Sequence, residues 1–466
     1  MTNEIYALSP LDGRYSKIRD ALSPYFSEAA LIKARVKVEV SWLKFLISKN
    51  IIDPKIIGEG VNLNEARGVI ECINNFDERD FYRIKKIEKK TNHDVKAVEL
   101  FVAEKLDNLG YGNLKSYVHI GCTSEDINNL AYGMTMRDGL NEVWLPAAEE
   151  LLLKVLGKAV NHADLPMLAH THGQPATPTT VGKEFLVFAA RMKRCMDEVK
   201  NVKMLGKFNG ATGNYSAMNF AFSKSDWPKL NREFVESLGM TFNPVTTQIE
   251  SHDYMSSLFD AMKRFNNVVL DLDNDMWMYI SMDYLKQIPV AGEVGSSTMP
   301  HKVNPINFEN SKANLELSNG ILSTLSDALQ VSRMQRDLSD SSSQRNIGMG
   351  FGYSLQAILE TQKGLGKIAV NGEKLHEDLE NHWEITAEPI QTMLRKYGDP
   401  DAYNKLKEMT RGRKTTEEDI LNFVGTLEEG YDISPEDIEA LRGVSPYNYV
   451  GLAGEIVRDH SDLNKI

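Results

Sequence analysis

The chain of 466 residues contains few cysteines and no long apolar run. Its three cysteines, Cys72, Cys122 and Cys195, are widely spaced and form no CxxC pair. This pattern argues against a disulfide framework or a zinc site, and it suits a reducing compartment. No stretch of about 18 apolar residues occurs, and no basic segment precedes an apolar one at the N-terminus, so we expect neither a transmembrane helix nor a signal peptide. The sequence therefore predicts a cytoplasmic protein.

Positive charge is also scarce, because 53 Lys and Arg face 65 Asp and Glu and give a net charge of −12 at pH 7. Nucleic-acid-binding proteins usually show a basic face, and anionic membranes attract basic clusters, so neither nucleic acid nor a membrane is the expected partner. A small anionic substrate remains compatible, because a few cations in a cleft can outweigh the global sign.

Stretches with helical periodicity and no helix breaker dominate the middle of the chain. From Leu258 to Ile280 apolar residues recur at steps of three or four, which predicts a helix with one buried stripe. A similar stripe runs from Phe185 to Val202, and the stretch from Leu31 to Lys49 also lacks a breaker. Because strands and helices do not alternate, the sequence predicts an all-α fold with a long helical bundle rather than a doubly wound sheet.

Changes in pattern divide the chain into three expected domains. Residues 1–112 are expected to form a mostly helical N-terminal domain, 113–365 a central helical bundle, and 366–466 a small helical domain. In the last of these, Ser434 and Pro435 are typical of the N-cap and the first position of a helix. No internal repeat of fixed period is visible.

The segment AGEVGSSTMPHKVNP, residues 291–305, interrupts two helical regions of the central domain. Its glycines, serines and prolines exclude an ordinary helix interior. It is either a surface loop of small polar residues, or a mobile lid that uses its glycines as hinges and carries a nucleophile or base over a pocket. Composition alone leaves both interpretations open.

A second polar segment is AHTHGQPATPTT, residues 169–180, in which His170 and His172 alternate. A metal pair is a weak interpretation, because no carboxylate stands at ligand spacing. Both imidazoles could be structural. A general acid is the third possibility, because histidine titrates nearest to neutral pH.

Polar residues also gather where two helices are expected to begin. Asn92, His93 and Asp94 form one group, and Thr123 and Ser124 the other. Asn or Asp in the first group, and the hydroxyls in the second, are typical N-caps. The same helix N-termini could bind an anion.

The segment SRMQRDLSDSSSQR, residues 332–345, combines arginines with serines. Arg333, Arg336, Arg345 and the serines at 341–343 could bind a phosphate through the planar guanidinium fork, or the segment could be a solvated turn. The following GMGFG, residues 348–352, resembles a nucleotide-binding fingerprint only superficially. No predicted strand precedes it, so we interpret it as close helix packing.

The loop motif GSSTMPHKVNP resembles the signature of the fumarase/aspartase superfamily, whose members eliminate fumarate. The motifs THGQPATP, TNHDVKAVE and HIGCTSEDINN resemble the adenylosuccinate lyase branch, and the bacterial long form in particular. SPLDGRY near the start and QRD at 335–337 are similar to that branch too. The resemblance runs through all three expected domains.

This resemblance implies an all-α, three-domain, fumarase/aspartase-like subunit that assembles as a homotetramer with active sites shared between subunits. No metal and no organic cofactor is expected. The implied substrates are adenylosuccinate, which yields AMP, and SAICAR, which yields AICAR, with fumarate released from both. The alternatives are another fumarate-releasing lyase, such as argininosuccinate lyase, and a catalytically silent structural protein on the same fold.

The reaction removes a weakly acidic proton beside a carboxylate and protonates the leaving nitrogen, so it needs a base, an acid and groups that stabilise a dianion. By the resemblance, Ser296 is the base and His172 the acid. Glu309 matches the carboxylate that orients His172, while Lys302 and Asn304 match groups that hold the succinyl carboxylates.

The resemblance also implies a larger set of substrate-binding residues. Gln248 matches a substrate-binding glutamine, and His119 matches a family histidine. Other histidines, His252 among them, are expected to be structural or at the surface. The complete expected binding set is Arg14, Tyr15, Asn92, His93, Asp94, His119, Thr123, Ser124, Gln248, Ser297, Lys302, Val303, Asn304, Asn310, Arg336, Ser341, Ser342 and Arg345.

Overall fold

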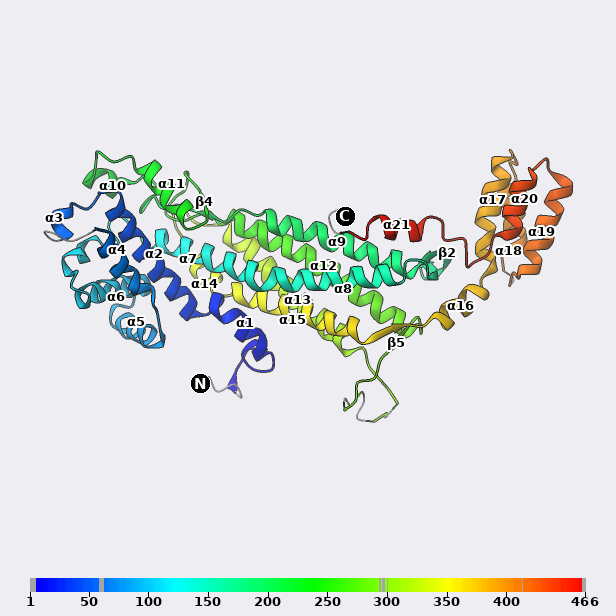
Figure 1. The fold of residues 1–466 in the computed structure, drawn as a ribbon, viewed down its shortest axis with the longest axis horizontal. Helices are drawn as coiled ribbons and strands as arrows, with labels where there is room; N and C mark the ends of the chain where they lie inside the picture. Colours follow the sequence, from blue (N-terminus) through cyan, green and yellow to red (C-terminus); the bar gives the residue numbers. More distant parts are fainter. Residues whose placement is uncertain are drawn as a thin grey trace. The chain divides into compact units, whose positions relative to one another are not determined.

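The computed structural model describes residues 6–57, 63–292, 295, 298–299, 301–412 and 414–462. Helices account for most of them, which confirms the predicted all-α class (Figure 1). Three small two-stranded sheets accompany the helices. Within the described ranges, no helix is long and apolar enough to cross a lipid bilayer.

The chain forms two compact units that interleave along the sequence. The first unit comprises residues 1–148, 196–266 and 314–356, and the second comprises 149–195, 267–313 and 357–466. The division into three domains at residues 112 and 365 stays a prediction.

Helix α2, Glu28–Ser48, is the central helix of the N-terminal part of the first unit and confirms the helix expected over 31–49. Ser27 caps it by accepting a hydrogen bond from the Ala30 N–H at 3.1 Å. It packs against its neighbours α1, α4, α5, α6 and α7. Its buried residues are apolar except for Arg35 and Glu39, which lie one helical turn apart.

The N-terminal part contains further short and medium-length elements. They are η2 Pro10–Asp12, α1 Ser16–Phe26, α3 Pro54–Ile57, α4 Leu63–Glu71, η3 Cys72–Asn74, α5 Glu78–Thr91, α6 Asp94–Asn108 and η4 Gly112–Tyr117.

Long helices form the middle of the chain, as the apolar stripes predicted. In α12 the stripe from Leu258 to Met276 is buried, while Ile280 is half-buried. Pro146 would suit the first position of a new helix, but helix α7 passes through one π-helical turn, 140–144, straight into α8. The long helices are α7 Ser124–Gly139, α8 Leu145–Asn161, α9 Val181–Asn201, α12 Asp253–Ser281, α13 Ile306–Leu329 and α15 Ile347–Gly366.

Buried polar contacts tie these helices together within the first unit. The Trp144 Nε1–H donates to Ser354 Oγ at 2.9 Å, and the Ser354 hydroxyl donates to Asn266 Oδ1 at 2.7 Å. Asn266 Nδ2 in turn donates to Ser318 Oγ at 3.2 Å. Since a buried polar group must be satisfied, these contacts determine how α12, α13 and α15 align in this unit.

The glycines at 348–352 lie in α15 and permit close packing, as predicted. A Cβ atom at Gly350 would approach the Leu322 side chain to 2.8 Å, and one at Gly352 would approach Leu11 to 2.8 Å. Both distances are shorter than a normal van der Waals contact. The glycines of this motif therefore allow close helix packing, and the motif is not a nucleotide-binding fingerprint.

A β-hairpin in the second unit, which the sequence did not predict, presents His172. Strands β1, Pro166–Thr171, and β2, Gln174–Thr180, pair antiparallel across a two-residue turn. His172 and Gly173 both have positive φ, 55° and 72°, as a type I′ hairpin turn requires. The fold thus places an exposed imidazole at the tip of a hairpin.

The C-terminal part of the second unit is a small helical bundle (Figure 1). Ile390, Leu394, Leu406 and Val424 belong to its buried core. Ser434 caps the last of these helices by accepting a hydrogen bond from the Asp437 N–H at 3.2 Å, which confirms the predicted cap. The four helices are α17 Ala387–Lys396, α18 Ala402–Thr410, α19 Glu417–Gly430 and α20 Pro435–Gly443.

The remaining elements are short. They are β3 Leu205–Gly206, α10 Ser216–Ala221, α11 Trp227–Ser237, β4 Thr241–Phe242, β5 Leu285–Gln287, α14 Ser339–Gln344, β6 Ile368–Val370, α16 Gly372–Glu380, η6 Trp383–Thr386 and α21 Ala453–Asp459. Strand β3 pairs with β4 in parallel, and β5 pairs antiparallel with β6.

Candidate active site

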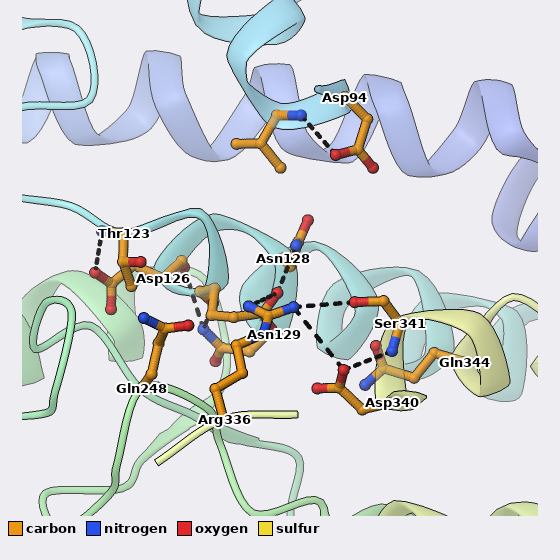
Figure 2. Close-up of polar contacts among 12 residues, drawn as sticks. Asp94, Thr123, Asp126, Asn128, Asn129, Gln248, Arg336, Asp340, Ser341 and Gln344 are labelled. Carbon is orange, nitrogen blue, oxygen red and sulfur yellow. Dashed lines mark hydrogen bonds and ion pairs between the residues drawn. The ribbon is translucent and has the colours of Figure 1, made fainter. Parts of the chain in front are cut away.

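A cavity of about 520 Å³ in the first unit brings together residues that are far apart in the sequence. Its walls come from α2, the α5–α6 junction, the start of α7, the segment at Gln248 and residues 336–345 (Figure 2). Ten residues of the predicted binding set line it: Asn92, His93, Asp94, Thr123, Ser124, Gln248, Arg336, Ser341, Ser342 and Arg345.

The junction of α5 and α6 turns one of these groups toward the cavity. Asn92 ends α5 in the left-handed conformation, with φ of 50°. His93 is the N-cap of α6, and its Nδ1 accepts a hydrogen bond from the Lys96 N–H at 3.2 Å. The expectation that Asn92 or Asp94 supplies the cap was wrong, because Asn92 is needed to end the preceding helix and the next residue takes the role.

Asp94 lies between two guanidinium groups. Its Oδ2 is 2.9 Å from Arg35 Nη2 and 3.3 Å from Arg345 Nη2. Burial alone would raise the pKa of Asp94, but the charge of Arg35, the Val95 amide and the charge of Arg345 together hold that pKa below its usual range. Asp94 is therefore ionised at neutral pH and orients both arginines.

The start of α7 is capped as predicted. Thr123 is its N-cap, and the Thr123 N–H donates to the Asp126 carboxylate at 2.8 Å, the returning half of a capping box. Ser124, Glu125 and Asn128 follow in the first turns and line the cavity.

Asp126 also forms a completely buried ion pair with Lys207, at 2.8 Å between Oδ1 and Nζ. The backbone N–H groups of Asn209 and Gly210 donate to the same carboxylate at 3.0 and 3.1 Å. Asn129 adds two bonds to the backbone of Lys207. The Asp126 carboxylate thereby joins the start of α7 to the 207–210 segment.

Arg336 is held from several sides (Figure 2). Its Nη1 is 2.8 Å from Glu125 Oε1, and its Nη2 donates to Ser341 Oγ at 3.1 Å. Asp340 Oδ1 lies 3.9 Å away. Because Glu125 and Asp340 are buried, they hold the guanidinium in one orientation. A ligand that binds this guanidinium would therefore cost little side-chain entropy.

His252 contacts Asp340, one of the acids near Arg336. It is fully buried, and its Nε2 lies 3.5 Å from Asp340 Oδ2. Burial would raise the pKa of Asp340, but the contacts with His252 and Arg336 keep that pKa below its usual range. The expected structural role of His252 is consistent with this position.

Three predicted residues of the first unit do not line the cavity. Arg14 is exposed, and Tyr15 occupies the N-cap position of α1. The His119 ring bonds to Glu39, with 2.6 Å between Nδ1 and Oε1.

The second unit holds the predicted groups for proton transfer. His172 is exposed, and within the described residues its ring makes no hydrogen bond or ion pair. Glu309 is exposed and accepts a hydrogen bond from Trp277 Nε1 at 3.2 Å, so an orienting contact with His172 stays a prediction.

The rest of the predicted set belongs to the loop before α13 and to α13 itself. Asn304 Nδ2 donates to the Gly295 carbonyl at 2.8 Å and closes the loop, while Lys302 and Val303 are exposed and Asn310 is half-buried. Ser296 and Ser297 lie outside the described residues.

Sequence reasoning missed six residues that line the cavity. Arg35 carried a usable signal, because a charged residue within an apolar helical stripe is rarely buried without a partner. Glu125 carried no such signal, because an acid in the first turn of a helix is common. The six are Arg35, Glu88, Glu125, Asn128, Tyr132 and Leu338. Among the residues that the structure describes, no cluster of three His, Cys, Asp or Glu side chains could hold a metal ion.

Known proteins match the chain over almost its entire length. A family model described as lyase matches residues 13–316, and one described as adenylosuccinate lyase C-terminal matches residues 332–450. Adenylosuccinate lyase of Escherichia coli strain K12 is 46% identical over 454 residues, which cover 97% of this chain and 98% of that protein. The chain belongs to the adenylosuccinate lyase family.

A second member of the adenylosuccinate lyase family, from Buchnera aphidicola subsp. Baizongia pistaciae, is 45% identical over 467 residues, which cover 100% of both chains. Solved structures share the fold at low identity. Fumarate lyase from Mesorhizobium sp. BNC1 superposes with a TM-score of 0.75 at 18% identity, covering 95% of this chain and 96% of that one. The predicted family membership and the lyase type of enzyme are confirmed.

Replacing Lys207 with Met is expected to destabilise the protein by about 3–5 kcal/mol, because breaking a buried pair leaves the Asp126 charge uncompensated in the core. Thermal and denaturant unfolding followed by circular dichroism would measure this loss. The control Arg458→Met removes an exposed pair with Asp164 and is expected to change stability little. Equal losses in the two variants would contradict the role of Lys207.

Proposed function

We propose that this chain catalyses the β-elimination of fumarate from adenylosuccinate, giving AMP, and from SAICAR, giving AICAR. The observation that carries the proposal is the cavity of the first unit, in which ten predicted binding residues meet in a member of the adenylosuccinate lyase family. The proposal includes a cytoplasmic location and small-molecule substrates without an organic cofactor.

The arginine- and serine-rich wall of the cavity suits a phosphate group. Arg336 and Arg345 provide planar donors for phosphate oxygens, and Ser341 and Ser342 add hydroxyl donors beside them. Fumarate-releasing lyases whose substrates lack a phosphate have no need for this wall. We therefore assign it to the nucleotide phosphate and the adjoining ribose.

The succinyl end is assigned to the α6 and α7 helix starts together with the loop before α13. Asn92, His93, Asp94, Thr123 and Ser124 surround one side of the cavity. In the proposed mechanism Lys302 and Asn304, with Val303, Asn310 and Ser297 around them, hold the two carboxylates. The attraction between Lys302 and the carboxylate that it holds becomes stronger as that carboxylate becomes a dianion in the transition state.

Ser296 is the proposed base, and His172 is the proposed acid that protonates the leaving nitrogen. A free serine is too weak a base at neutral pH, so desolvation and nearby donors must activate it. Glu309 would favour the protonated form of His172 by its negative charge. The exposed position of His172 at a hairpin tip leaves its ring available to such a site.

We further propose a homotetramer with active sites shared between subunits. In the segment 331–338, which contains Arg336, the apolar side chains of Val331, Met334 and Leu338 are exposed. Exposed apolar groups gathered in one place are typical of protein contacts. Arg14 and Tyr15, which do not line this cavity, are candidates for a contribution to the site of a neighbouring subunit.

The substrate assignment is tested with purified protein and an absorbance assay for adenylosuccinate cleavage, with argininosuccinate as the contrasting substrate. Arg345→Met is expected to lower kcat/KM for adenylosuccinate roughly 10- to 100-fold, because a hydrogen bond to a charged group is lost. Arg333→Met is the matched control, since Arg333 belongs to the same segment, pairs with Asp337 at the surface and does not line the cavity.

Cleavage of argininosuccinate without cleavage of adenylosuccinate would contradict the proposed function. An unchanged kcat/KM in Arg345→Met would show that this arginine does not bind the phosphate. The proposed reaction would then still be tested by the comparison of the two substrates.

The sharing of sites is tested with two inactive variants. His172→Gln and Ser296→Ala are each expected to lower kcat by about 10² or more, the usual contribution of a general acid or base. Mixing the two variants should restore part of the activity, because some sites of a mixed tetramer receive both native residues. Full subunit exchange, verified by mass spectrometry, without recovery would exclude shared sites.

A further inference from the structure

Glu39 is a buried carboxylate that the proposed mechanism does not yet use. It is 1% exposed and lies in the inner face of α2, which is apolar apart from Glu39 and Arg35. Burying an ionised carboxylate is unfavourable unless a partner compensates it. The described contact of this group is with His119, at 2.6 Å between Oε1 and Nδ1, while Oε2 has no hydrogen-bond partner among the described residues.

The backbone around His119 is held by the same helix. His119 has a positive φ of 61°, an uncommon conformation for a residue with a side chain. One turn after Glu39, the Trp42 Nε1–H donates to the Ile120 carbonyl at 3.2 Å. Helix α2 thus holds the loop that leads into α7 by its backbone and by the imidazole. Nδ1 makes the contact with Glu39, and Nε2 has no hydrogen-bond partner among the residues that the structure describes.

Acidic groups face the His119 ring from three helices. They are Glu39 of α2, Glu99 of α6 and Asp126 of α7, the last of which is paired with Lys207. Burial lowers the pKa of His119, but the hydrogen bond and charge of Glu39, with smaller contributions from Glu99 and Asp126, raise that pKa above its ordinary value. The contact with Glu39 therefore favours the protonated form of the ring.

We propose that Glu39 is a positioning residue that keeps His119 as an imidazolium, so that its Nε2–H can donate to an anionic oxygen of the substrate. The inference rests on the proposed function, since it gives His119 its ligand. Anionic oxygens occur on both the phosphate and the succinyl group. His119 does not line the cavity, but its loop leads into α7, whose N-cap Thr123, four residues later, does.

The protonation claim is tested without any activity measurement. In protein labelled with ¹³C at histidine Cε1, the His119 signal, assigned by its loss in His119→Asn, should titrate above pH 6.5, the ordinary histidine midpoint. In Glu39→Gln the midpoint should fall by about 1 to 3 pH units, the usual effect of losing a neighbouring opposite charge. A wild-type midpoint below 6.5, or an unchanged midpoint in the variant, would overturn the inference.

The consequence for binding has a defined sign. Because the cation exists below the pKa of His119, kcat/KM should fall as the pH rises through that pKa, and Glu39→Gln should move the fall to lower pH. Glu39→Asp retains the charge and should restore the wild-type profile in part. Trp42→Phe is the matched control on the same helix, and it is expected to leave the midpoint of the profile in place because it removes no charge.

Product inhibition distinguishes the two sources of the anionic oxygen. AMP carries only the phosphate and fumarate only the carboxylates. If His119 contacts the phosphate, Glu39→Gln weakens AMP inhibition at neutral pH and leaves fumarate inhibition unchanged, and the reverse holds for a carboxylate contact. Unchanged inhibition by both would overturn the ligand assignment, whereas wild-type protein that releases no fumarate from adenylosuccinate would refute the proposed function instead.

Discussion

The buried ion pair between Asp126 and Lys207 is the contact on which the cavity of the first unit depends. Asp126 also accepts the amides of Thr123 and Gly210, so one carboxylate joins the start of α7 to the 207–210 segment. The connection continues through Gln248, whose Nε2 donates to the Ala211 carbonyl and whose backbone N–H donates to the Gln335 carbonyl. It then returns to α7, because the neighbouring Arg336 pairs with Glu125. Thr123, Gln248 and Arg336, which line the cavity, thus belong to one closed ring of polar contacts.

Helix α2 supplies a second constraint through two charged residues spaced by one turn. Arg35 contacts Asp94 and Asn128, while Glu39 contacts His119. A helix keeps residues four apart on one face, so both contacts are coupled by the rigidity of a single element. The apolar residues around them bury the helix and lower the local dielectric, which strengthens each contact. The position of α2 thereby links three segments of the candidate site.

Local signals in the sequence were sufficient for the long helices, the caps at Thr123 and Ser434, and the glycine packing of α15. These features depend on spacing within a few residues. The charge of Arg35 in an apolar stripe indicates a partner but does not identify it. The partners of Arg35, Glu39 and Lys207 lie far away in the sequence, and only the fold brings them together. The hairpin at 166–180 was missed for another reason. Pro175 and Pro178 disfavour a strand, and the turn depends on a left-handed His172, which residue type alone does not indicate.

The cavity's own charges constrain what it can bind. Arg35, Arg336 and Arg345 are already paired with Asp94, Glu125 and Asp340, so a ligand must compete with these carboxylates for the same donors. A neutral ligand gains nothing from such a site, and a single carboxylate only replaces an existing partner. A phosphate offers more charge and three acceptor oxygens, so it competes best. Because the arginines are held in place beforehand, binding loses little side-chain entropy. In the proposed function, the paired acids therefore favour a phosphorylated substrate over a neutral or singly charged one.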